Sequence, residues 1–164
     1  METYTSDSSS DAESHVVDYR NSNLTLSKAE SEFFNLYKTD KMYDEIETIM
    51  LFNNQLSGLP LALMKFNNLH TLDISNNCLK TISMEVILHC PLKTLIAKNN
   101  QLTNASLPKS LQSSACQLRE LNLSGNNLTH FPKQVLELNS SLKYLYLNGN
   151  CIQTISKEIG KLRK

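Results

Sequence analysis

The sequence lacks an excess of charge of either sign, and it lacks long apolar stretches. Among its 164 residues, 16 Lys and Arg balance 16 Asp and Glu. A chain without net charge creates no overall field that would attract nucleic acid or an anionic membrane surface, so we expect neither as a partner. No stretch approaches the roughly 20 consecutive apolar residues that a membrane-spanning helix needs.

Signals of secretion are also missing. Residues 1–14 are polar and acidic, without the basic start and apolar run of a secretory signal. The four cysteines are spread along the chain without the clustered pairs typical of secreted disulfide frameworks, at Cys78, Cys90, Cys116 and Cys151. We therefore expect the protein in a reducing compartment, the cytoplasm or the nucleus.

What the sequence does contain is a repeat. The pattern L-x-x-L-x-L-x-x-N-x-L, with isoleucine or alanine at some leucine positions, recurs every 23 to 26 residues around Asn54, Asn77, Asn100, Asn126 and Asn150. Five copies in phase predict a leucine-rich repeat solenoid of the α/β class. Its parallel strands would form a concave face, and short helical or irregular segments would return along the convex face. Leu-Pro or Phe-Pro at residues 59–60, 107–108 and 131–132 favours short 3₁₀ turns in these returns.

The five asparagines have a structural role in this prediction. A carboxamide carries two donor hydrogens and an acceptor oxygen, so it can satisfy backbone groups of its own turn and of the adjacent repeat. We therefore expect a ladder of asparagines inside an otherwise apolar stack.

The periodicity divides the chain into three parts. Residues 1–14 are rich in serine and acid and predict a disordered tail. Residues 15–45 suit a degenerate capping repeat with a helix, since Ser27 and Glu30 match a capping box. Apolar residues follow at helical spacing, namely Ala29, Phe33, Leu36 and Tyr37. Residues 46–164 hold five repeats, and the additions at 104–106 and 113–114 in the third should bulge at the surface.

The chain stops where a sixth repeat would begin, without a C-terminal cap. The last predicted strand would present an unpaired edge and the end of the leucine core to solvent, which is an association hazard. We therefore expect either missing C-terminal repeats or self-association at the uncapped end.

Residues between the core leucines of each strand should point outward on the concave face. Exposed apolar and aromatic side chains there have no packing role inside the solenoid, and protein interfaces use such residues as anchors. The predicted protein-binding residues are Met50, Phe52, Asp73, Ile96, Lys98, Glu120, Asn122, Tyr144 and Tyr146, and the outermost column also includes Ser75 and Ser124. Two alternatives remain: isolated exposed hydrophobics are normal on protein surfaces, and the N-terminal region could fold over Met50 and Phe52.

Motifs for catalysis and cofactor binding are lacking. The four histidines fall at different positions of different repeats, and equivalent positions assemble no Ser/His/Asp or Cys/His arrangement. Gly125 and Gly149 occupy turns rather than a phosphate-binding loop. Cys90 and Cys116 share a repeat position, which allows a disulfide or a shared metal, but the pattern favours buried structural thiols. We expect no enzyme activity, cofactor or metal.

Several segments resemble one family of intracellular leucine-rich repeat proteins. They are LDISNN at 72–77, LIAKNN at 95–100, LPK at 107–109 and LNLSGN at 121–126, and LIAKNN followed by a long repeat is the most specific. The resemblance covers residues 16–162. It implies further repeats, a cysteine-containing C-terminal region and a protein-binding role as substrate receptor of a cullin-type ubiquitin ligase. A Ras-pathway signalling scaffold is the alternative, because a period near 23 with Leu-Pro after the turn occurs there too; an enzyme is a remote one.

Overall fold

Parallel strands stacked in chain order form the centre of the molecule. The computed structural model describes residues 15–35, 40–111, 117–155 and 157–162. Within these residues one sheet has the order β1-β2-β3-β4-β5-β6, and every neighbouring pair is parallel. The strands are β1 (Val16–Asp18), β2 (Thr48–Met50), β3 (Thr71–Asp73), β4 (Thr94–Ile96), β5 (Glu120–Asn122) and β6 (Tyr144–Tyr146). Each repeat therefore contributes one strand, as the sequence predicts.

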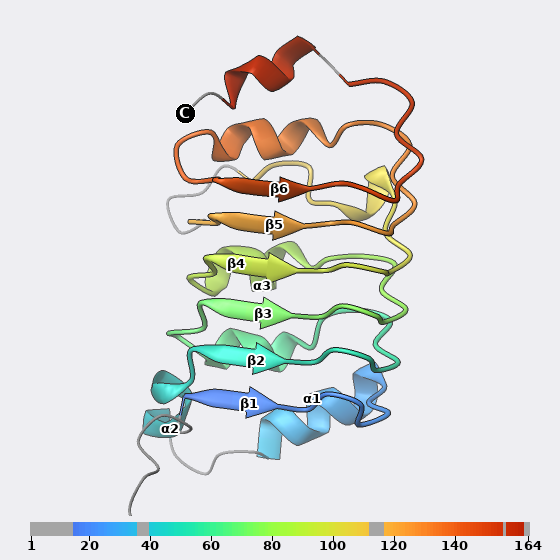
Figure 1. Ribbon diagram of the computed structural model, residues 1–164. Coiled ribbons are helices and arrows are strands. Elements are labelled where there is room, and N and C mark those ends of the chain that lie inside the picture. The colour runs from blue at the N-terminus through green and yellow to red at the C-terminus, as the bar shows by residue number, and fades with distance from the viewer. Residues whose placement is uncertain (1–14, 36–39, 112–116, 156, 163–164) are drawn as a thin grey trace, which may run out of the picture.

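Short helices occupy the other side of the sheet. Figure 1 shows α3 behind the middle strands, and the face of β2 to β6 toward the viewer has no helix over it. We call that open face the concave face. The helices are α1 (Leu26–Asn35), α2 (Asp40–Glu45), α3 (Met84–His89) and four 3₁₀ segments, η1 (Leu61–Lys65), η2 (Asn104–Ser106), η3 (Lys133–Leu138) and η4 (Lys157–Lys161). The predicted 3₁₀ turns after Pro60 and Pro132 are confirmed, since these prolines directly precede η1 and η3. A leucine-rich repeat solenoid results.

The leucines of the pattern fill the space between sheet and helices. In the middle strand position Ile49, Leu72, Leu95 and Leu121 are all buried, because each stacks on its equivalent in the next repeat. The burial weakens toward β6, where Leu145 is only half-buried. The core is thus continuous along the stack.

The asparagine ladder is confirmed in atomic detail. Asn100 Oδ1 accepts a hydrogen bond from the amide of Leu79 in the preceding repeat, at 3.0 Å. Asn100 Nδ2 donates to Ile74 O of that repeat at 3.0 Å and to Ala97 O of its own turn at 3.2 Å. Asn77 and Asn126 make the equivalent bonds. Each carboxamide therefore joins two repeats.

The residue before each ladder asparagine adopts a left-handed backbone. It is an asparagine in the first three regular repeats, and glycine in the last two, at Gly125 (φ 65°) and Gly149 (φ 68°). An added Cβ would lie 2.1 Å from Asn99 Oδ1 at Gly125 and 3.3 Å from the Gly125 backbone nitrogen at Gly149. Asparagine tolerates the left-handed backbone in the other repeats, so the close approach of Asn99 is what favours glycine at position 125.

The N-terminal segment corrects one prediction. Ser27 does not cap the helix, since α1 already begins at Leu26 and the Lys28 amide donates to Thr25 Oγ1 at 3.4 Å. The Glu30 carboxylate accepts instead from the amides of Leu61 and Ala62, at 2.5 and 3.1 Å, at the start of η1. The glutamate thus joins α1 to the next repeat. Ala29 and Phe33 are buried as predicted, whereas Leu36, Tyr37 and residues 1–14 lie outside the described residues.

The lengthened third repeat has a defined structure. Residues 104–106 form η2, in which Ala105 is exposed and Ser106 is buried. The Asn104 side chain accepts from the Thr129 amide at 2.9 Å and donates to His130 O at 2.8 Å, so the extra turn is bonded to the fourth repeat. The register of β4 and β5 is undisturbed. The second addition, residues 113–114, lies outside the described residues.

Candidate functional site

The predicted protein-binding residues fall on the concave face in two groups. Met50 and Phe52 are half-buried at the β2 end of the sheet, beside Asp73. Tyr144 and Tyr146 are exposed on β6, paired in register with Glu120 and Asn122 of β5. Four strand spacings separate β2 from β6, about 19 Å. Ile96 and Lys98 lie between the groups, half-buried and exposed respectively.

Tyr144 and Tyr146 are the most exposed aromatic side chains of this face among the described residues, and Val16 at the other end of the sheet is exposed to 43%. The exposed fractions of the two tyrosines are 57% and 41%, whereas Leu145 between them points toward the core. Alternation along a strand explains the arrangement, since successive side chains point to opposite faces of a sheet. Two neighbouring phenol rings thus stand on one face, each offering apolar area and a hydroxyl.

Asp73 and Asn122, the last residues of β3 and β5, also have a structural role. Asp73 Oδ1 accepts from the Ser75 amide at 2.9 Å, and Asn122 Oδ1 accepts from the Ser124 amide at 3.0 Å. These bonds begin the turn that follows each strand. One side-chain oxygen of each residue is therefore already engaged by its own backbone.

Ser75 and Ser124 occupy outward positions as predicted, but both are buried and neither is available for binding. Their hydroxyls are too short to reach beyond the neighbouring side chains; that of Ser124 donates to Asn148 Oδ1 at 2.6 Å. At the equivalent positions of other repeats, the larger side chains of Phe52 and Lys98 remain accessible.

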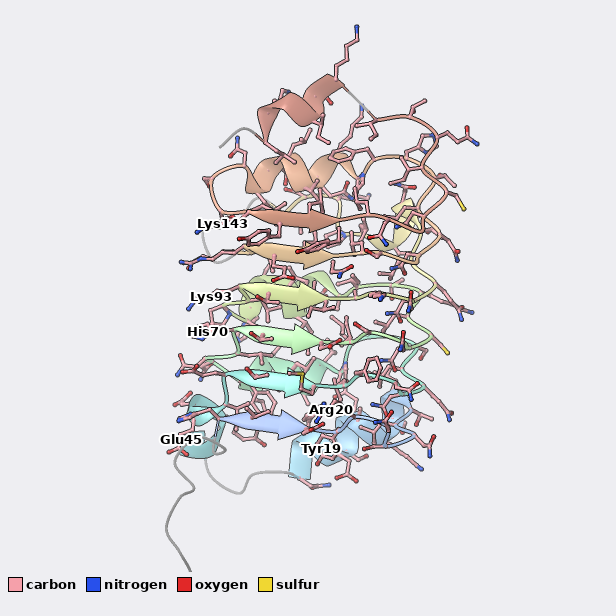
Figure 2. The ribbon with its side chains drawn as sticks, viewed as in Figure 1. Tyr19, Arg20, Glu45, His70, Lys93 and Lys143 are labelled. Atoms are coloured by element: carbon pink, nitrogen blue, oxygen red, sulfur yellow. The ribbon has the colours of Figure 1, made fainter. Side chains whose placement is uncertain are left out.

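An ion pair between Asp18 and Arg20 lies at the first strand. It was not predicted from the sequence, because the first repeat departs from the regular pattern. Arg20 Nε lies 2.9 Å from both carboxylate oxygens of Asp18, and the Arg20 NH2 group lies 2.6 Å from Asp18 Oδ2. The hydrogen bonds from Arg20 hold the pKa of Asp18 below its usual value. Figure 2 places Arg20 and Tyr19 at β1, one strand from Met50. Two-residue alternation along a strand could have indicated it, because Asp18 and Arg20 are two residues apart and therefore lie on the same side of the chain.

Groups suited to catalysis are dispersed. Among the described residues, no cluster of three or more His, Cys, Asp and Glu could hold a metal ion. The Cys90 thiol is buried and donates to Leu63 O at 3.3 Å, and burial raises its pKa to about 11. Cys90 is the buried thiol that the pattern favours, and Cys116, with which a disulfide or a shared metal was the alternative, lies outside the described residues. None of the described helices has both the length and the apolar character to cross a membrane.

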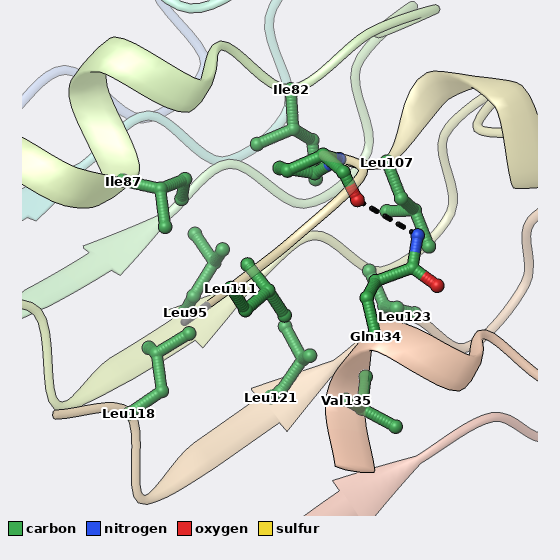
Figure 3. Close-up of a pocket in the computed structure, with 11 residues that line it drawn as sticks. Ile82, Ile87, Leu95, Leu107, Leu111, Leu118, Leu121, Leu123, Gln134 and Val135 are labelled. Atoms are coloured by element: carbon green, nitrogen blue, oxygen red, sulfur yellow. Dashed lines mark hydrogen bonds between the residues drawn. The ribbon is translucent and has the colours of Figure 1, made fainter. Parts of the chain in front are cut away.

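A small cavity lies in the core behind β4 and β5 (Figure 3). Its volume is about 20 Å³, and apolar side chains line most of it, including Ile82, Ile87, Leu95, Leu121 and Val135. Gln134 Nε2 donates to Pro108 O at 2.9 Å beside it. A space of this size holds at most one water, and an apolar lining offers water few partners. Leu107, Pro108 and Leu111 of the lengthened third repeat also line it.

Comparisons with known proteins agree with the fold. Two family models described as leucine rich repeat match residues 116–164 and residues 68–90. The chain is 40% identical over 116 residues to leucine-rich repeat-containing protein 58 of Xenopus tropicalis, which covers 71% of this chain and 32% of that protein. It is 33% identical over 141 residues to Ras guanine nucleotide exchange factor V of Dictyostelium discoideum, covering 71% of this chain and 7% of that protein. The chain thus spans a third or less of these relatives.

Solved structures give the same result. A leucine-rich repeat protein of Leptospira interrogans aligns with a TM-score of 0.64 and 31% identity, over 76% of this chain and 31% of that one. The repeat ectodomain of the Arabidopsis thaliana membrane receptor kinase GASSHO1/SCHENGEN3, solved in complex with Casparian strip integrity factor 2, aligns with a TM-score of 0.53 and 32% identity. It covers 75% of this chain and 18% of that one.

Proposed function

We propose that this chain, which belongs to the leucine-rich repeat proteins and is a protein-interaction module, binds its partner on the concave face with Tyr144 and Tyr146 as anchors. The observation that carries the proposal is the exposure of both rings on one strand face, beside Glu120 and Asn122. Aromatic side chains ringed by polar ones are the residues on which binding energy concentrates in protein interfaces. Both tyrosines occupy outward positions of their strand, where the apolar core does not require an aromatic side chain.

The proposal is tested with a double variant and a matched control. Tyr144→Ala with Tyr146→Ala removes both anchors, whereas Phe34→Ala with Leu61→Ala removes two exposed apolar side chains on the helical side. Both variants should keep their free energy of unfolding within about 1 kcal/mol, as expected for surface positions. In quantitative affinity capture from cytosol, the proteins held by the unaltered chain should be lost with the tyrosine variant and kept with the control. Equal capture by both variants would contradict the tyrosine site.

For the cellular role, we further propose that the bound protein is a substrate of a cullin-type ubiquitin ligase. The support is the resemblance noted at LIAKNN, residues 95–100, and the similarity to leucine-rich repeat-containing protein 58. The ligase-docking segment would lie outside the repeats present here. A Ras-pathway scaffold is the second candidate, favoured by the similarity to a Ras guanine nucleotide exchange factor. Both roles belong to the cytoplasm or nucleus.

The same capture experiment separates the two roles when it is done with the longest natural form of the protein. Ligase subunits, together with proteins that accumulate when the proteasome is inhibited, would support the first role. Small GTPases and phosphatase subunits would support the second and would contradict the first. A fluorescent fusion would test the expected location.

A further inference from the structure

Three basic residues line up at the amino ends of neighbouring strands. Lys93, Arg119 and Lys143 directly precede β4, β5 and β6, and we call them the basic edge. A backbone ladder holds them in register: the Arg119 amide donates to Lys93 O at 2.8 Å, and the Lys143 amide donates to Arg119 O at 2.7 Å. The Lys93 amide continues the ladder to His70 O at 2.8 Å. Figure 2 shows His70, Lys93 and Lys143 along one border of the sheet.

Among the described residues, the three side chains of the basic edge form no ion pair. Arg119 and Lys143 are exposed and Lys93 is half-buried. Three cations on consecutive strands occupy about 10 Å, two strand spacings, and like charges facing each other across strands repel. An anionic partner would relieve that repulsion.

The other end of the same border is acidic. Glu47 precedes β2 in the equivalent position, and its Oε2 lies 4.0 Å from His70 Nδ1. Asp44 and Glu45 are exposed next to it, at the end of α2. The sign of the charge therefore changes along the border, although the whole chain is neutral. Attraction for an anion is confined to the β4 to β6 end, beside Tyr144.

We propose that the basic edge binds an acidic, extended segment of a partner protein that crosses the starts of β4, β5 and β6. Extended chain advances about 3.3 Å per residue, so carboxylates within about four consecutive residues span the three cations. The segment deepens the proposed function, since its path passes Tyr144 and it would belong to the same partner.

A peptide suits this border better than a nucleic acid does. Glu120 follows Arg119 directly and is half-buried on the same face. Its carboxylate needs hydrogen-bond donors, which the amides of a peptide backbone supply. A DNA backbone presents no such donor, because its phosphate and sugar oxygens only accept hydrogen bonds.

The test measures fluorescence anisotropy of a short fluorescein-labelled peptide, a run of glutamates flanked by glycine and serine, added to the full chain. It should bind at about 50 mM salt and weaken strongly at about 500 mM, where the screening length is much shorter. The variant Lys93→Glu/Arg119→Glu/Lys143→Glu should lose about tenfold or more in affinity, at about two- to fivefold per ion pair. Should this reversal unfold the chain, glutamine at the same positions gives a neutral variant with the same expected direction.

The matched control is Lys28→Glu/Lys80→Glu/Lys109→Glu, which has the same net charge and alters exposed lysines away from the basic edge. It should bind the peptide as the unaltered chain does. Equal loss in both variants, or binding of a glutamine version of the peptide, would overturn the proposal. Tighter or equal binding of oligothymidylate would overturn it in favour of nucleic acid.

Two further comparisons separate this proposal from others. Partner capture is compared for the tyrosine variant Tyr144→Ala with Tyr146→Ala and for the variant Lys93→Glu/Arg119→Glu/Lys143→Glu. Loss of capture with the tyrosine variant alone would overturn the basic edge, and loss with the basic-edge variant alone would overturn the tyrosine site. The acidic N-terminal segment of the chain is the other candidate occupant. If neutralising its four carboxylates strengthens peptide binding, that segment fills the basic edge and a partner segment does not; these residues are Glu2, Asp7, Asp11 and Glu13.

Discussion

Replacing Asn100 by alanine should leave one buried amide without a partner. The Leu79 amide donates to Asn100 Oδ1 at 3.0 Å, and Leu79 is fully buried. The three carbonyls that Asn100 Nδ2 contacts, those of Ile74, Ala97 and Lys98, each keep another donor. These donors are Asn77 Nδ2 for Ile74 O, Asn126 Nδ2 for Ala97 O and the Asn76 amide for Lys98 O. The destabilisation expected for Asn100→Ala therefore comes mainly from the unpaired Leu79 amide.

A buried donor without an acceptor costs about 1–3 kcal/mol. The Asn100→Ala variant should lose that amount of unfolding free energy, or about 2–4 °C of melting temperature per kcal/mol for a chain of this size. Asn127→Ala is the matched control, because Asn127 is exposed and only its backbone amide makes a hydrogen bond among the described residues. It should stay within about 0.5 kcal/mol of the unaltered chain in urea unfolding followed by circular dichroism. If the two variants are equally stable, the ladder does not stabilise the stack as argued.

Three other substitutions or reactions probe the fold. Gly125→Ala should lower the melting temperature more than Gly149→Ala, because both positions are left-handed but only the first also meets a neighbouring side chain. With iodoacetamide at about pH 8, exposed Cys78 should react well before buried Cys90. The pKa of Cys90, about 11, leaves little of the reactive thiolate at that pH. Peptide mass spectrometry measures the alkylation of both cysteines. Val135→Ile should fill part of the core cavity and raise the unfolding free energy by up to about 0.8 kcal/mol, whereas a lower melting temperature would show that the cavity cannot take a methylene.

The repeat made the regular part of the fold predictable. Once Asn77 and Asn100 set the period, the register of β3 and β4 and the burial of Leu72 and Leu95 follow, because each repeat contacts only its neighbours. The basic edge was predictable on the same grounds. Each of its members directly follows the first leucine of its repeat.

Features that depend on contacts between different elements were not predictable. Glu30 and Ser27 match a local capping box, yet the Glu30 carboxylate bonds amides of η1 some thirty residues away. Ser75 occupies an outward position but is buried, because its side chain is short and its neighbours are larger. The spacing of residues within one repeat carries no information on either.

Photocrosslinking from defined positions tests the use of the concave face most directly. A benzophenone amino acid replaces Ile96, half-buried on the concave face, or Leu61, 55% exposed on the helical side. On irradiation in cytosol, position 96 should yield a crosslinked partner protein that Tyr144→Ala with Tyr146→Ala abolishes, and position 61 should yield none. Crosslinking of the same partner from position 61 but not from position 96 would contradict the account.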